Sequence, residues 1–92
     1  GDAYRLLMRK LPQELWDEHT SEDISEIEPL IRAWQQRGEM IRRDPEIIVS
    51  LIRSVFVLTI HKTELGEEYF EQTVELLIEC VAIGLIPEED HL

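Results

Sequence analysis

The sequence predicts an all-α fold, an antiparallel helical bundle of about four helices, and three observations indicate it. Apolar residues recur at the three- and four-residue spacing of amphipathic helices along most of the chain. No segment shows the strict alternation of apolar and polar residues that is typical of a strand. The connections between the apolar segments are short, so we expect successive long helices to pack antiparallel.

The first half of the chain predicts two helices separated by a polar loop. Apolar residues at helical spacing indicate a first helix over residues 4–15, and Pro12 should kink or break it because proline has no amide hydrogen. We expect the polar stretch 17–23 to form the loop. A second helix then runs over residues 24–37 and ends at Gly38, a residue type suited to the left-handed conformation beyond a helix terminus.

The second half predicts two longer helices, over residues 44–62 and 67–86, joined by a short turn. The first of them opens with Asp44, a good capping residue, followed by Pro45 at the first helical position. Pro87 ends the second. These two helices carry most of the apolar residues of the chain.

Both long helices have more apolar surface than one hydrophobic core can cover. At about 100° per residue, the apolar residues of each cover roughly 220° of its circumference, against about 100° for a helix that covers one core. We therefore expect one side to pack within the chain and the other against a second copy, giving a homodimer with an intermolecular four-helix bundle. A helical wheel leaves open which half of each arc faces the partner. The candidate residues of the dimer interface are Ile52, Phe56, Ile60, Val74, Leu77, Val81 and Leu85.

The single cysteine, Cys80, lies inside the apolar arc of the last helix, so we expect it to be a small buried hydrophobe. Together with Thr73, it lies near Gly84 on one side of that helix, where small residues would let another helix approach closely. The equal alternative is that Gly84 merely weakens the helix near its end.

Composition and charge argue against several classes of function. The chain has 92 residues, enough for one domain, and 9 basic against 20 acidic side chains give a formal charge of −11. This balance argues against direct contact with nucleic acid or anionic lipid. The sequence has no apolar run long enough to span a bilayer and no signal peptide at its start, so we expect a cytoplasmic protein without membrane contact.

The sequence also offers little catalytic chemistry. Three histidines, at positions 19, 61 and 91, are widely scattered, and none has the spacing of a zinc site. No phosphate-binding loop or nucleophile motif is present. We therefore expect no metal, no cofactor and no enzymatic activity.

Residues 34–46, Trp-Gln-Gln-Arg-Gly-Glu-Met-Ile-Arg-Arg-Asp-Pro-Glu, resemble a recurring stretch of the TetR/AcrR family of bacterial transcriptional regulators. In that family a helix ends in Gly-Glu-apolar, a short polar turn follows, and Asp-Pro-Glu opens the penultimate long helix. The resemblance extends over residues 24–86 and rests on the order and spacing of the segments. It implies the regulatory domain of a TetR-like repressor, which homodimerises through its last two helices and senses a small hydrophobic effector.

The chain departs from the family pattern because it has no basic helix-turn-helix. We therefore expect residues 1–92 to be a single effector-binding and dimerisation domain, a fragment that reaches DNA only through an absent N-terminal domain. The candidate effector-binding residues are Tyr4, Met8, Trp34, Phe56 and His61. For Trp34 a place in the core is the favoured alternative. The alternative function is a free-standing helical interaction module or adaptor without a small-molecule site.

Overall fold

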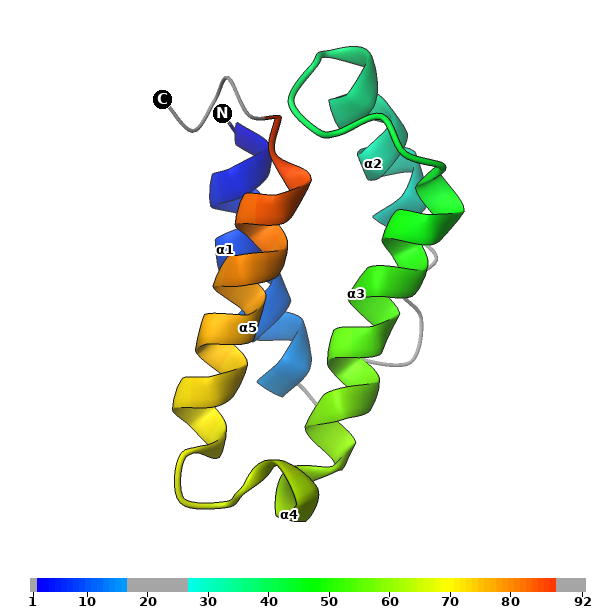
Figure 1. Ribbon diagram of the computed structural model, residues 1–92. Coiled ribbons are helices and arrows are strands. Elements are labelled where there is room, and N and C mark those ends of the chain that lie inside the picture. The colour runs from blue at the N-terminus through cyan, green and yellow to red at the C-terminus, as the bar shows by residue number, and fades with distance from the viewer. Residues whose placement is uncertain (1, 17–26, 88–92) are drawn as a thin grey trace.

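A computed structural model describes residues 2–16 and 27–87, and within these residues the only regular elements are helices. The helices are α1 (Asp2–Trp16), α2 (Ile27–Gln36), α3 (Pro45–Ile60), α4 (Lys62–Leu65) and α5 (Phe70–Leu85). In Figure 1, α3 and α5 run antiparallel, and the short α4 lies in the connection between them. The predicted all-α class is therefore confirmed.

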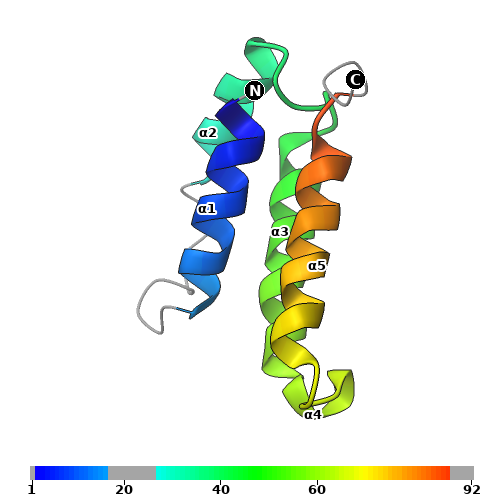
Figure 2. The same ribbon diagram turned by 90° about the vertical axis from the view of Figure 1, so that its left-hand side faces the viewer.

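The helices are arranged in two layers. α1 packs against α5, α2 packs against α3, and α3 packs against α5. Figure 2 shows α1 and α2 together on one side of the α3–α5 pair. The shortest dimension of the molecule, 19 Å between Cα atoms, corresponds to about two helix diameters of roughly 10 Å. Each face of the α3–α5 layer therefore has a different environment: α1 and α2 cover one face, and no described helix covers the other.

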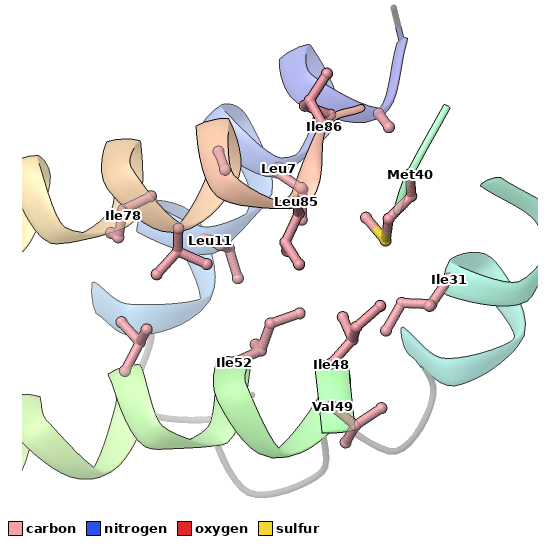
Figure 3. Packing of buried hydrophobic residues seen from close by; sticks show 14 of the residues in the cluster. Leu7, Leu11, Ile31, Met40, Ile48, Val49, Ile52, Ile78, Leu85 and Ile86 are labelled. Atoms are coloured by element: carbon pink, nitrogen blue, oxygen red, sulfur yellow. The ribbon is translucent and has the colours of Figure 1, made fainter. Parts of the chain in front are cut away.

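The core fills the space between the two layers and draws on every long helix. Figure 3 shows how its side chains converge from α1, α2, α3, α5 and the turn before α3. Its largest fully buried side chains are Leu7, Leu11, Ile31, Met40, Ile48, Ile52, Val55, Val74, Ile78 and Leu85. Burying one such side chain stabilises the fold by about 1.5–3 kcal/mol, so this cluster supplies most of the energy that holds the layers together.

Local signals in the sequence explain where α2 ends and α3 begins. Gly38 has a φ of 75°, the left-handed conformation in which glycine is favoured. The Asp44 carboxylate accepts a 2.9 Å hydrogen bond from the backbone amide of Glu46, and Pro45 is the first residue of α3. Both the predicted glycine terminus and the predicted capping aspartate are confirmed.

Two expectations about the chain path need correction. α1 runs without interruption through Pro12. The burial of Leu7 and Leu11, one helical turn apart, holds this helix against the core and outweighs the hydrogen bond that proline cannot donate. The predicted turn after α3 includes the single helical turn α4, and the chain leaves it at Gly66, with φ 98°. The predicted loop 17–23 and the predicted start of α2 before Ile27 lie outside the described residues.

Candidate functional site: the outer face of α3 and α5

α3 exposes a second apolar stripe in addition to the one that enters the core. Ile47, Leu51 and Leu58 are all exposed, Ile47 by 57%. With Ser54, which lies between the two leucines, they recur at intervals of four, three and four residues. That spacing is typical of a helix that packs along a partner helix.

α5 exposes a corresponding stripe. Tyr69, which directly precedes the helix, and Leu76 are each 61% exposed, and Ile83 is exposed as well. Thr73 and Cys80 fill the positions between them, so the stripe recurs at intervals of four, three, four and three residues. The repeated three-four spacing again matches a packing seam rather than a solvated surface.

The two exposed stripes lie on the same face of the α3–α5 layer. At about 100° per residue, each lies roughly 90–160° from the buried stripe of its helix, displaced in the same rotational sense. α3 and α5 run antiparallel (Figure 1), and α1 and α2 lie together on one side of them (Figure 2). In this arrangement, a displacement in the same rotational sense about each helix axis places both exposed stripes on the side that faces away from α1 and α2. We call this surface the outer face. It consists of Ile47, Leu51, Ser54, Leu58, Tyr69, Thr73, Leu76, Cys80 and Ile83.

The outer face carries no charged side chain, although the chain as a whole is highly charged. Two of the acidic residues of α5, Glu75 and Glu79, lie toward this side of the helix and are exposed. A contiguous exposed apolar surface with a polar border is typical of a protein–protein interaction site. The arrangement therefore suits association with another apolar surface.

The residues predicted for the dimer interface fall mostly on the other side of these helices. Ile52, Val74, Val81 and Leu85 are buried in the core of this chain, so they do not contribute to an exposed seam. Phe56 and Leu77 are half-buried. Ile60 is 78% exposed but lies off the outer face on the wheel.

The helical wheel left open which half of each apolar arc faces outward, because the positions of α1 and α2 determine which half is covered. The seven-residue spacing from Leu51 to Leu58 and from Leu76 to Ile83 was the signal that could have found the outer face.

The five predicted effector residues do not gather at one place. Trp34 is buried in the core, as the alternative interpretation expected. It belongs to α2, which lies beside the start of α3, whereas His61 directly follows the end of α3 and is exposed (Figure 1). Tyr4, Met8 and Phe56 are half-buried against the core. None of the five lines the surface hollow that lies between α2 and the turn before α3.

Cys80 is exposed, contrary to the expectation that it would be buried. Its place in the apolar arc was identified correctly, but that arc is wider than the part that α1 and α3 cover. Within the described residues, no group of three or more His, Cys, Asp or Glu side chains is arranged to hold a metal ion. In the same part of the chain, no helix is long and apolar enough to cross a membrane.

Comparisons with known proteins add no assignment: no protein-family model, no curated protein and no solved structure matches this chain. The resemblance of residues 24–86 to TetR/AcrR regulators therefore stays a prediction from the sequence.

Proposed function

We propose that this chain is a self-association domain, which forms a homodimer when the outer faces of two copies meet. In the dimer, α3 and α5 of both copies would form an antiparallel four-helix bundle. The observation that carries the proposal is the outer face itself: two apolar stripes with packing periodicity, on helices whose opposite stripes already fill a complete core.

A second copy of the chain fits this surface for two reasons. Two antiparallel helices with matching stripes form a self-complementary surface, which a two-fold axis closes at the dimer. The stripe on α5 also alternates large and small residues, since Thr73 and Cys80 separate Tyr69, Leu76 and Ile83. Large side chains of one copy can then pack over small ones of the other, as in knobs-into-holes packing.

The proposed wider role is that of the dimerisation region of a TetR-like transcriptional repressor. It is supported by the sequence resemblance and by the antiparallel pairing of the last two long helices, α3 and α5, which have one face open. DNA binding would belong to a separate basic domain, because a chain with a formal charge of −11 is repelled as a whole by the extended phosphate backbone of DNA. Effector sensing rests on the resemblance alone.

The experiment that tests self-association compares two glutamate substitutions at exposed apolar positions. Leu76→Glu places a charge in the centre of the outer face, whereas Val57→Glu places the same charge on an exposed part of α3 outside it. We expect size exclusion with light scattering to show a folded monomer for Leu76→Glu and a wild-type dimer for Val57→Glu.

Equal masses for Leu76→Glu and the wild type would contradict the assignment of the outer face. A monomeric wild type would instead favour the adaptor, in which another protein covers this surface.

A further inference from the structure

A second feature of the molecule lies away from the outer face, where α2 meets the turn that leads into α3. A hollow of about 410 Å³ is lined by Arg32, Gln35, Gln36, Arg42 and Arg43. Its lining contains three guanidinium groups and two carboxamides but no carboxylate. Arginine stays charged at every physiological pH, so the hollow is a concentrated positive site on a chain with a formal charge of −11.

The backbone around this hollow is held in a fixed shape. The Gln35 amide donates two hydrogen bonds across the turn, of 3.0 Å to the carbonyl oxygen of Ile41 and 2.7 Å to that of Arg43. Met40, directly before Ile41, is buried in the core, and the backbone amide of Ile41 donates to the carbonyl oxygen of Leu85. The turn therefore presents Arg42 and Arg43 beside α2 without needing a ligand to order it.

The charges of the hollow are only partly neutralised. Glu28 accepts hydrogen bonds of 3.1 and 2.8 Å from Nε and Nη2 of Arg32, an exposed pair of small energetic value. No acidic side chain among residues 2–16 and 27–87 pairs with Arg42 or Arg43. The nearest carboxylate in sequence, Asp44, accepts a hydrogen bond from the start of α3 instead.

We infer that this hollow binds a small phosphate monoester. Guanidinium groups bind phosphate oxygens through paired hydrogen bonds. A site with several guanidinium groups therefore suits a doubly charged phosphate ligand better than a ligand with a single carboxylate. The volume lies in the range of about 300–1,000 Å³ that small-molecule sites occupy, which leaves room for an organic group beside the phosphate. Gln36, whose exposed amide lines the hollow, can donate to or accept from a hydroxyl on that group.

Titration of the protein with phenyl phosphate and with inorganic phosphate, at constant ionic strength balanced with chloride, tests this inference. We expect backbone amide shifts in NMR spectra to concentrate in residues 35–43. Tighter binding of phenyl phosphate would assign the site to an organic phosphate, and equal binding of both would assign it to free phosphate. Absence of localised shifts up to about 10 mM of either probe, a concentration at which even weak millimolar binding is visible, would overturn the proposal.

A matched pair of variants separates a built site from general charge attraction. Arg42→Gln with Arg43→Gln removes two charges from the hollow, and Arg9→Gln with Lys10→Gln removes two exposed charges from α1. We expect the first pair to weaken phenyl phosphate binding about tenfold or more, since hydrogen bonds to charged groups are lost, and the second to change it less than about twofold. Equal weakening by both pairs would contradict the site.

Circular dichroism of both double variants checks that the helices persist. The titration is repeated on Leu76→Glu, where we expect unchanged affinity because Leu76 does not line the hollow. Loss of phosphate binding and loss of dimerisation are therefore separate outcomes.

Discussion

The backbone amide of Ile41 donates a 2.8 Å hydrogen bond to the carbonyl oxygen of Leu85. This contact ties the turn before α3 to the last residue of α5, at the end of the pair opposite α4. Met40 and Ile86 are buried at the same end (Figure 3). Because α3 and α5 are connected at both ends, their exposed stripes keep a fixed relative position. The outer face is therefore formed within a single chain.

Val81→Glu should unfold the protein, in contrast to Leu76→Glu. Val81 is buried in the core, whereas Leu76 is exposed on the outer face. An unpaired charge in the core should lower the free energy of unfolding by about 3 kcal/mol or more. Urea denaturation followed by circular dichroism measures the difference. A folded, monomeric Val81→Glu protein would instead place Val81 at an interface between copies, as the sequence predicted.

Gln35→Ala should destabilise the fold through the turn rather than through the core. The Gln35 side chain donates two hydrogen bonds to the carbonyl oxygens of Ile41 and Arg43. At about 0.5–1.5 kcal/mol each, their loss should lower the free energy of unfolding by roughly 1–3 kcal/mol in urea denaturation. The control is Gln36→Ala, an exposed position where we expect a change within about 0.5 kcal/mol. Equal effects of the two substitutions would refute this role of Gln35.

Asp44→Ala should lower the free energy of unfolding by about 1 kcal/mol, because it removes the acceptor that satisfies the Glu46 amide at the start of α3. Asp44→Asn keeps a side-chain oxygen at this position and should retain most of the stability. Thermal denaturation of the wild type, Asp44→Asn and Asp44→Ala measures the order of their stabilities. If Asp44→Asn loses as much as Asp44→Ala, the carboxylate acts by its charge and not as a cap.

Gly84→Ala should stabilise the isolated chain. A Cβ atom built at Gly84 meets nothing within 4 Å, and alanine is favoured over glycine inside a helix by about 0.5–1 kcal/mol. The test is urea denaturation in the Leu76→Glu background, where a loss of stability would contradict the open space at Gly84. The same Gly84→Ala substitution is also made in the wild-type chain. A weaker dimer would show that helices of two copies approach closely at Gly84, whereas an unchanged dimer would show that the glycine only weakens α5.

Much of the helical structure followed from local chemistry. Asp44 and Pro45 marked the start of α3, and Gly38 marked the end of α2, because capping and left-handed conformations depend on the residue itself. Pro12 does not break α1, although a break was one of the two outcomes that the sequence predicted. The free-energy cost of a proline inside a helix follows from its ring and can be read from the sequence. The free energy gained by burying Leu7 and Leu11 depends on the position of α5, which the sequence does not show.

For the candidate site, too, the sequence predicted local features but not those that depend on the packing of the helices. Periodicity gave the width of the apolar arcs on α3 and α5, from which the sequence predicted a second packing partner. It did not assign Val81 to the core or Leu76 to the surface, because that depends on where α1 and α2 lie. The hollow of Arg32, Arg42 and Arg43 was not predicted either. It depends on the tertiary position of the turn, which the Gln35 side chain holds against α2 by two hydrogen bonds.

The measurement that tests self-association most directly is light scattering after size exclusion, run on the wild-type chain over a dilution series. The chain has a mass of 10.8 kDa. We predict a species of twice that mass, converting to the single-chain mass only on dilution, and a single-chain mass at all concentrations for Leu76→Glu. A wild-type protein that stays at the single-chain mass at the highest concentration would contradict the proposal that the outer faces of two copies pair.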